Sequence, residues 1–157
     1  MVRVVDDFLP MDVFKQMSDW IMGEDITWRY APIIDDDDRY SQYCHIVYKD
    51  DIPYSDQFNQ FNQTFADRLS VQSWVRIKVN SKVRTERLIE YPLHYDDPCE
   101  KIAFFNVNTC NGYTYFEDHE PVPSVANRMI LFRRDMKHGG TTASNVNRRI
   151  GINFNYY

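Results

Sequence analysis

The sequence predicts one α+β domain that is mainly β: a double-stranded β-helix, or jelly-roll barrel, with N-terminal helices packed on one outer face. Three observations predict this class. Apolar residues recur at helical spacing only in the first part of the chain, and from Trp74 onward they alternate with polar residues. Several short predicted strands, separated by turn residues, follow the helices. The composition agrees, because 11 Tyr and 10 Phe suit a β-rich core.

The 157 residues are expected to form a single domain, 1–157, because this length suits one hydrophobic core. A helical support is expected over about 1–72 and the jelly-roll core over about 73–157. The chain opens with a short predicted strand, Arg3 to Phe8. Pro10 then suits the first turn of a helix that ends near Gly23.

A second helix is predicted between Ser55 and Leu69. Good starting residues open this segment, and its apolar residues are three or four apart: Phe58, Phe61, Phe65 and Leu69. We expect this stripe to pack against the back of the sheet. Before it, the acidic run Asp35 to Asp38 lacks the spaced ligands and the glycine of a calcium loop, so a solvated turn is expected.

The strands of the predicted barrel begin where apolar and polar residues alternate, from Trp74 to Asn80. Further strands are expected over five segments: Arg87–His94, Ile102–Val107, Tyr113–Glu117, Arg128–Phe132 and Arg149–Tyr156. Turn residues separate them at Asp97-Pro98, Asn111-Gly112 and Pro121 to Ser124.

Charge and cysteine content narrow the class of protein. The net charge of −5 disfavours capture of nucleic acid by a basic surface. The three cysteines, odd in number and without metal-finger spacing, are expected to be reduced structural thiols. The N-terminus does not resemble a signal peptide, and no segment is apolar enough to span a membrane. We therefore expect a cytoplasmic protein without a membrane partner, as a monomer or a small homo-oligomer.

Candidate metal ligands stand out at His94 and Asp96, with His138 a further 44 residues along the chain. Residues two positions apart on a strand point to the same face. A distant second histidine would therefore complete two imidazoles and one carboxylate on one side of a metal. Such a triad suits Fe(II) and leaves positions open, although Zn, Mn or Ni would also fit. The alternative is a hydrogen-bonded His–Asp pair at a strand end. His45 and His119 have no carboxylate two residues on and are expected to be ordinary surface or loop residues.

The last predicted strand has one polar face, formed by Arg149, Gly151, Asn153 and Asn155. This face suggests the wet mouth of a barrel, in which Gly151 would leave room for a ligand. A guanidinium at Arg149 can hold a carboxylate through two hydrogen bonds. Arg148 points to the opposite face, with the apolar residues. The alternative is an exposed arginine pair at the start of a strand.

Four segments together resemble the iron- and 2-oxoglutarate-dependent oxygenases, specifically their prolyl 4-hydroxylase-like branch: HYDD, FFNVNTCNGYTYFED, NRMILF and KHGGTTASNVNRRIGINFNYY. The resemblance covers roughly Trp74 to Tyr157, and more loosely the opening VVDDFLPMDVF. It implies that His94, Asp96 and His138 bind iron and that Arg149 holds the distal carboxylate of 2-oxoglutarate.

The resemblance also implies two further contacts with the cosubstrate. Thr114, in a turn that the family writes Gly-Gly-x-Thr, would hydrogen-bond the same carboxylate, although Asn111 here replaces the first glycine. Asn106 occupies a strand position where several relatives carry a tyrosine that contacts the cosubstrate, but its side chain is shorter. Ordinary structural roles for Thr114 and Asn106 stay open.

The implied activity is an oxygenase reaction that uses Fe(II), 2-oxoglutarate and O2, releases succinate and hydroxylates a small-molecule or peptide substrate. Peptidyl or free proline is the favoured substrate. One alternative is an oxygenase that modifies nucleic acid, supported by the basic residues Arg133, Arg134, Lys137 and Arg148. The acidic net charge weighs against it. The other alternative is a jelly roll that binds metal without catalysis.

Overall fold

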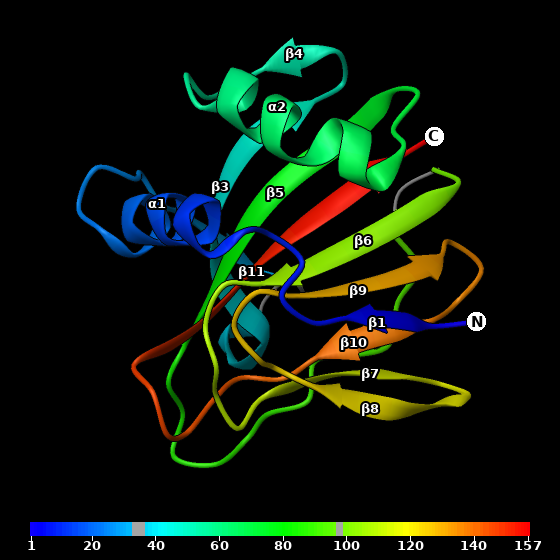
Figure 1. Cartoon of the computed structure of the whole chain (residues 1–157). Coiled ribbons are helices and arrows are strands. Elements are labelled where there is room, and N and C mark those ends of the chain that lie inside the picture. Colours follow the sequence, from blue (N-terminus) through cyan, green and yellow to red (C-terminus); the bar gives the residue numbers. More distant parts are fainter. Residues whose placement is uncertain (33–36, 97–98) are drawn as a thin grey trace.

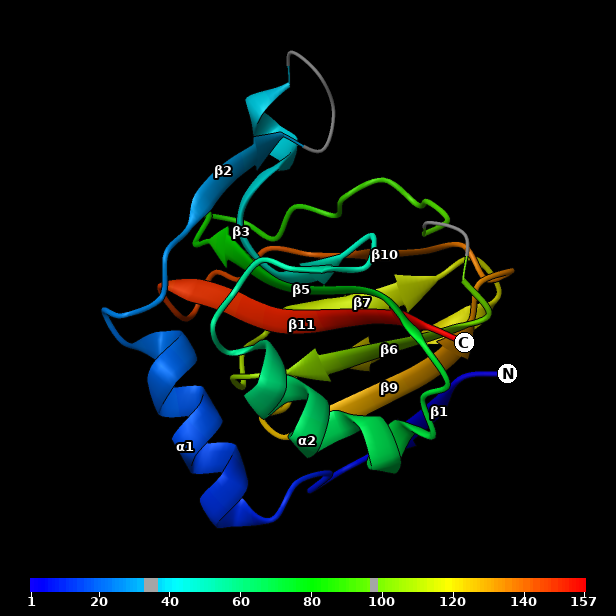
Figure 2. The same cartoon turned by 90° about the horizontal axis from the view of Figure 1, so that it is seen from above.

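The computed structural model describes residues 1–32, 37–96 and 99–157, and of Asp38 only the backbone. Within these ranges it has two α-helices, α1 (Met11–Met22) and α2 (Phe58–Leu69), a 3-10 turn at Asp38–Tyr40, and two antiparallel sheets. In Figures 1 and 2 both helices cover the outer face of the larger sheet, and the smaller sheet lies on its opposite side.

The larger sheet has eight strands in the order β1-β9-β6-β11-β5-β3-β2, with β4 paired to β3. Their bounds are β1 Arg3–Val5, β2 Arg29–Pro32, β3 Ser41–Lys49, β4 Ile52–Pro53, β5 Trp74–Val83, β6 Lys101–Asn106, β9 Arg128–Arg133 and β11 Arg148–Tyr156. The smaller sheet has the order β10-β7-β8, with bounds β7 Tyr113–Phe116, β8 His119–Pro123 and β10 His138–Gly140. The two sheets form the sides of the barrel.

β11 separates an apolar layer from a polar one. Its residues Ile150, Ile152 and Phe154 are buried beneath the helices, in a core that includes Phe61 and Phe65 of α2. The alternate residues of β11 face the barrel interior and are buried as well. Because both faces of the strand are covered, its polar residues line an enclosed space and not a solvent-exposed surface.

A second apolar cluster fills one end of the barrel interior, between the two sheets. Its largest members come from one strand of each sheet, Phe132 of β9 and Phe116 of β7, and their rings meet edge to face at 5.1 Å. This cluster leaves the other end of the interior, next to β5 and β11, for polar side chains.

Two sequence-based expectations are wrong. Arg87–His94 is not a strand: it is joined to its neighbours only by single bridges, from Glu90 to Thr141 and from His94 to His138. Pro121–Ser124 is not a turn, because β8 runs through it. β8 is an edge strand of the smaller sheet, where a proline, which has no N–H to donate, is tolerated.

The N-terminal part contributes more β structure than expected. Strands β2, β3 and β4 lie between the helices, and β3, which is nine residues long, pairs with both β5 and β2. The expected strand at Arg3–Phe8 is shorter, three residues in β1. The expected turn at Asp97-Pro98 and the residues Asp35 and Asp36 of the acidic run lie outside the described residues.

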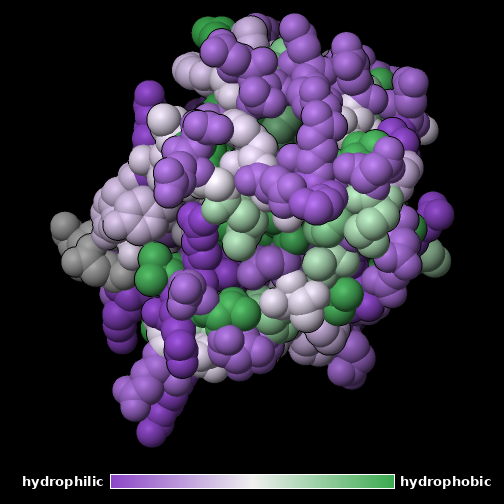
Figure 3. Space-filling view, turned by 60° about the vertical axis from the view of Figure 1, so that its left-hand side comes forward, coloured by the Kyte–Doolittle hydropathy of each residue, from purple (hydrophilic) through white to green (hydrophobic). Residues whose placement is uncertain are grey.

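The helices of the described residues are too short to cross a membrane, since α1 and α2 have 12 residues each and a span needs about 20. On the face shown in Figure 3, hydrophobic residues lie in small groups among hydrophilic ones. The three cysteines are free and buried.

Phe65 should be a main source of stability, because it is fully buried between α2 and the sheet and contacts the rings of Phe105 and Phe154. Phe65→Ala should lower the free energy of unfolding by about 3–5 kcal/mol, as for other buried aromatic truncations. Chemical denaturation measures this. The control is Phe58→Ala on the same helix, which is only half-buried and should cost clearly less. Equal losses would contradict the packing described.

Candidate metal centre and barrel cavity

His94 and His138 are brought together by their backbones. They lie directly opposite each other in an antiparallel bridge and exchange both hydrogen bonds, 3.0 Å from the His94 N–H and 3.1 Å from the His138 N–H. Residues opposite each other in such a pair send their side chains to the same face. The imidazole rings are accordingly 4.7 Å apart between centroids. This bridge does the positioning that a regular strand was expected to do.

Asp96 completes the group from two residues beyond His94. Its Oδ1 is 3.6 Å from Nε2 of His94 and 3.8 Å from Nε2 of His138. Its other oxygen, Oδ2, accepts hydrogen bonds from the side-chain amides of Asn153 and Asn155 at 2.8 and 2.9 Å. The two amides come from the inner face of β11 and fix the carboxylate, so that one oxygen faces the histidines.

Asn155 has a defined orientation. Its Oδ1 accepts from Nε of Arg76 at 3.2 Å, and because an arginine can only donate, the amide nitrogen must face Asp96. Arg76 also lies 3.7 Å from Asp96 Oδ1. The polar residues of β5 and β11 therefore support the carboxylate from one side, while the histidines lie on the other.

Hydrogen bonds to backbone carbonyls determine the tautomer of both histidines. Nδ1 of His94 lies 3.0 Å from the carbonyl of Pro92, and Nδ1 of His138 lies 3.2 Å from that of Met136. A carbonyl oxygen only accepts, so in each ring Nδ1 carries a proton, and Nε2 is the nitrogen that has the lone pair when the ring is neutral. Both lone pairs belong to the atoms nearest Asp96. This arrangement is common for metal-binding histidines.

Electrostatics favour a charged carboxylate at this site. Burial alone would raise the pKa of Asp96, but its interactions with the two histidines and the two amides hold that pKa well below its usual range. The hydrogen bond to Asp96 raises the pKa of His94. Burial lowers the pKa of His138, whose ring packs 4.7 Å from that of Phe132. An ionised Asp96 and a neutral His138 are the protonation states that a metal ligand needs.

His94, Asp96 and His138 fit a divalent metal ion. One ligand atom from each lies within 4.8 Å of the others. Two imidazole nitrogens and one carboxylate oxygen on one side of an ion match the donor set of non-haem Fe(II) centres. The side chain of His94 is 48% exposed, compared with 9% for His138 and 4% for Asp96, so among the described residues of the centre His94 is the one most open to solvent.

The triad lies in a cavity of about 310 Å³ inside the barrel. Arg149 lines the same cavity from β11 and is buried. Its guanidinium donates to three neutral acceptors: Oγ of Ser124 at 2.7 Å, the carbonyl of Thr141 at 3.0 Å and Oγ1 of Thr114 at 2.9 Å. These bonds use three of its five N–H donors and leave one on each terminal nitrogen.

Arg148, the neighbouring residue, points the other way. Its guanidinium donates to the carbonyl of Met22 at the end of α1 and lies over the ring of Trp28. The alternation expected for the last strand is therefore correct, and Arg149 is the arginine that enters the barrel. Thr114 accepts from Arg149 with its hydroxyl oxygen and still has a hydroxyl proton to donate.

Asn106 does not line the cavity. It is 1% exposed, and its amide donates to the carbonyl of Arg128. Phe104, on the same face of β6, lines the cavity instead, and the guanidinium of Arg149 lies 5.6 Å from its ring centre. Phe104 also fills the space over Gly151: a Cβ there would come within 2.2 Å of the ring. The room at Gly151 therefore accommodates a phenylalanine ring and not a ligand.

Sequence analysis missed the contribution of β5 to the cavity. Four residues of this strand line it: Arg76, Lys78, Asn80 and Lys82. Their alternation with apolar residues was visible, but an alternating antiparallel strand usually turns its polar face to solvent. Tyr91, which precedes the metal ligands, forms another wall; its hydroxyl donates to the carbonyl of Ser41, and burial raises its pKa to about 12.

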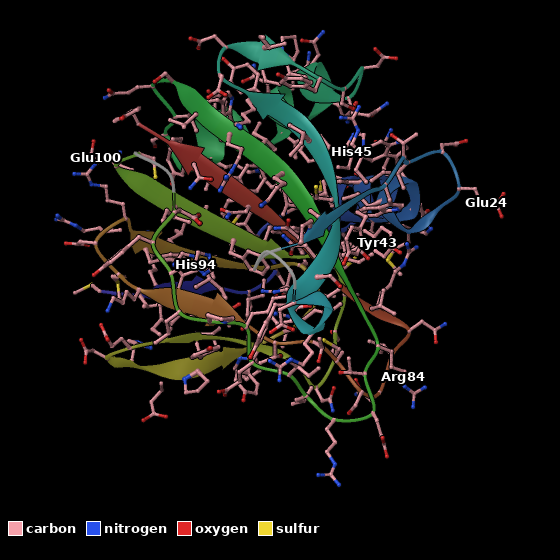
Figure 4. The ribbon with its side chains drawn as sticks, turned by 180° about the vertical axis from the view of Figure 1, so that it is seen from behind. Glu24, Tyr43, His45, Arg84, His94 and Glu100 are labelled. Carbon is pink, nitrogen blue, oxygen red and sulfur yellow. The ribbon has the colours of Figure 1, made fainter. Side chains whose placement is uncertain are left out.

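The other two histidines lie outside the site, as expected. His45 packs edge to face on Trp20 and contacts the carbonyl of Thr27, and His119 is exposed. In Figure 4, His45 and Arg84 lie on other parts of the molecule from His94. Of the basic residues of the nucleic-acid alternative, Arg133 pairs with Asp135 and Lys137 with Glu117, and Arg148 donates to the carbonyl of Met22.

No protein-family model matches the sequence, and no curated protein matches it. Solved structures match across nearly the whole chain. A prolyl hydroxylase from Trichoplax adhaerens, in complex with a hypoxia inducible factor oxygen degradation domain peptide fragment, is 11% identical with a TM-score of 0.70, covering 99% of this chain and 83% of its own. A 2OG-Fe(II) oxygenase family oxidoreductase from Burkholderia pseudomallei is 11% identical with a TM-score of 0.67, covering 99% and 84%.

A prolyl-4-hydroxylase from Pseudomonas putida is 13% identical with a TM-score of 0.64, covering 99% of this chain and 92% of its own. The chain therefore has the fold of the 2OG-Fe(II) oxygenases, prolyl hydroxylases among them. The double-stranded β-helix expected from the sequence is confirmed.

Replacing a metal ligand should abolish metal binding without unfolding the protein. His138→Ala should no longer bind one Fe(II) per chain, because only one imidazole and the carboxylate remain. Anaerobic calorimetric titration with Fe(II) measures this, and circular dichroism checks the fold. The control is His119→Ala, an exposed histidine outside the centre. Unchanged binding in His138→Ala would contradict the assignment.

Asn153 should affect the metal through Asp96. Asn153→Ala removes one of the two amides that hold Oδ2, and it should weaken Fe(II) binding about 10- to 100-fold, as other changes behind metal ligands do. The same anaerobic titration measures the change. Asn59→Ala, on the exposed side of α2, should leave the affinity unaltered. If the two variants bind alike, the amides do not position the carboxylate for a metal.

Proposed function

We propose that this protein is an Fe(II)- and 2-oxoglutarate-dependent oxygenase that hydroxylates its substrate. The observation that carries the proposal is the content of one cavity: a two-histidine, one-carboxylate centre and a buried arginine with donors to spare. The fold shared with 2OG-Fe(II) oxygenases supports it.

His94, Asp96 and His138 would hold the iron. Iron bound there, with 2-oxoglutarate and O2, supplies the chemistry of the reaction: decarboxylation to succinate and transfer of an oxygen atom to a C–H bond. The protein holds Nδ1 of each imidazole on a backbone carbonyl, which leaves Nε2 as the atom that faces the metal, and it keeps the carboxylate ionised. No side chain has to act as a nucleophile, and the chain's own residues bind, orient and enclose the reactants.

Arg149 would hold the distal carboxylate of 2-oxoglutarate. One unused N–H on each terminal nitrogen makes a fork that suits the two oxygens of a carboxylate, and Thr114 has a hydroxyl proton beside it. Gly140, which contacts Arg149, lies two residues from His138 on β10, about 7 Å at ~3.3 Å per residue. This separation of the arginine from the metal centre suits a short dicarboxylic acid.

Phe104 and Tyr91 have supporting roles in this proposal. Phe104 covers the guanidinium of Arg149 and, with Tyr91, gives the cavity apolar walls that displace water from the charged groups. Water exclusion strengthens the electrostatic contacts inside the cavity. Asn106 has no role at the cosubstrate, since Phe104 occupies the position that it was expected to fill.

A peptide or a small molecule is the proposed substrate, with peptidyl or free proline favoured. Two of the similar structures are prolyl hydroxylases, and one of them is bound to a peptide fragment. The open side of the metal centre, at His94, is the approach that a substrate would use. The pairing of Arg133 and Lys137 with carboxylates, and the contact of Arg148 with α1, argue against a nucleic-acid substrate.

Substitutions of the neighbouring residues Arg149 and Arg148 should have different effects on the affinity for 2-oxoglutarate. Arg149→Met removes the charged partner of the distal carboxylate, worth about 1.5–3 kcal/mol, and should weaken 2-oxoglutarate binding roughly 10- to 100-fold. Arg148→Met is the matched control, because Arg148 contacts α1 outside the cavity. Calorimetry with the metal-loaded protein measures both. The reverse ranking would overturn the proposed cosubstrate site.

Succinate release from 2-oxoglutarate tests the activity and the substrate class together. We expect Fe(II)-dependent release that is stimulated by proline-rich peptides or free proline at physiological salt. Alkylated oligonucleotides serve as the comparison, and stimulation by them alone would make the protein an oxygenase of nucleic acid. A complete absence of 2-oxoglutarate binding would identify a jelly roll that binds metal without catalysis.

A further inference from the structure

Lys82 is a second cation beside Arg149 in the cavity. The two residues are direct register partners, Lys82 on β5 and Arg149 on β11. Both point to the same place on β10. The Nη1 of Arg149 lies 2.8 Å, and the Nζ of Lys82 2.9 Å, from the position that a Cβ on Gly140 would take, so the two nitrogens are at most 5.7 Å apart. Their charges therefore converge on one small region.

Lys82 is held in the cavity by an aromatic ring and not by a carboxylate. Its ammonium lies 4.4 Å from the ring centre of Tyr91, a cation–π contact. In the described parts of the chain, no carboxylate pairs with Lys82. Burial, followed by the charges of Arg149 and Lys78, lowers the pKa of Lys82 well below its ordinary value. Burial also lowers the pKa of Arg149, to about 10.

Two cations so close together repel each other. The repulsion is stronger in a buried cavity, because less water screens the charges. An anion placed between them removes this cost, since it attracts both charges at once. The region in question is the one where the unused N–H donors of Arg149 lie and where Gly140 leaves the space free. The structure of the cavity is therefore adapted to a carboxylate with two cationic partners.

We propose that Lys82 and Arg149 together bind the distal carboxylate of the cosubstrate, and that Lys82 makes the site selective for a dicarboxylic 2-oxo acid. The inference rests on the proposed function, because it assigns a second partner to the same ligand. Arg149 supplies the two-pronged contact, and Lys82 supplies a further charge-assisted hydrogen bond from the opposite strand. A 2-oxo acid with a methyl group at its distal end has no charge there and can accept no hydrogen bond from either cation.

The test compares 2-oxoglutarate with 2-oxopentanoate, which has the same five-carbon chain but ends in a methyl group. Calorimetry on Zn(II)-loaded protein measures the dissociation constants without turnover. Lys82→Met should weaken 2-oxoglutarate binding about tenfold or more, the size expected for a charged hydrogen bond, and should leave 2-oxopentanoate binding unchanged. Lys82→Arg should retain most of the affinity. Lys49→Met, an exposed lysine outside the cavity, is the matched control.

A thermal-denaturation measurement keeps the test independent of folding defects. Lys82→Met removes a cation that lacks a partner in the free protein, so its melting temperature should equal or exceed that of the wild type. The rise in melting temperature caused by 2-oxoglutarate should shrink in the same variant. Gly140→Ala is a second probe, because its methyl group would occupy the point where the two nitrogens meet. Because that methyl group would come within 2.8 Å of Nη1 of Arg149 and 2.9 Å of Nζ of Lys82, it should displace both nitrogens and weaken 2-oxoglutarate binding.

The outcomes separate this inference from the proposed function. If Lys82→Met binds 2-oxoglutarate as the wild type does while Arg149→Met does not, the role of Lys82 is refuted and the proposed function stands. If the wild type itself does not bind 2-oxoglutarate, both proposals fail. An equal loss of affinity for both 2-oxo acids in Lys82→Met would also refute selectivity, since the lysine would then act on the shared part of the ligand.

Discussion

β11 is hydrogen-bonded to β5 on one side and to β6 on the other, and its register determines the composition of the cavity. One face of the strand is packed under α2, with Phe154 against Phe65. That packing forces the alternate residues, from Arg149 to Asn155, into the barrel. A slip of one residue would send Arg148 inward and the apolar residues into a polar cavity. The burial of the phenylalanines beneath the helices therefore also places Arg149 and the two asparagines that hold Asp96.

The charges inside the barrel are arranged in two regions along β5 and β11. At one end two imidazoles and Arg76 surround the ionised carboxylate of Asp96. At the other end Arg149 and Lys82 have no carboxylate partner in the described residues. Burying uncompensated charge is costly, and natural structures retain it where a ligand supplies the missing charge. The cavity thus has one region suited to a cation and one suited to an anion, a few residues apart on the same strands.

The sequence predicts some of this arrangement well. The alternation of β11 is unambiguous because its apolar residues occupy every second position, so the inward direction of Arg149 follows from the pattern alone. The three candidate metal ligands follow from residue chemistry and spacing, and their binding of a metal stays a prediction. The contact that brings them together does not follow from the sequence. His94 and His138 meet in a single backbone bridge, and β10, which contains His138, is only three residues long. Neither has a periodicity that a sequence pattern could reveal.

Alternation shows which face a residue occupies, but not which residue of that face lies opposite the ligand. Asn106 and Phe104 share a face of β6, and only the pairing with β11, Phe104 opposite Asn153 and Asn106 opposite Gly151, shows that Phe104 reaches the cavity. Lys82 was overlooked for a related reason. A polar face on an antiparallel strand normally indicates solvent, and only closure by the smaller sheet makes that face an interior.

The same closure explains why the candidate metal centre is accessible from one direction. Phe116 of the smaller sheet and Phe132 of β9 cover His138, and β11 covers Asp96. His94, on an extended segment without a strand of its own, is left at the opening. In the proposed function, a substrate would therefore approach beside His94, and the carboxylate of the cosubstrate would lie at the far end of the cavity, out of its path.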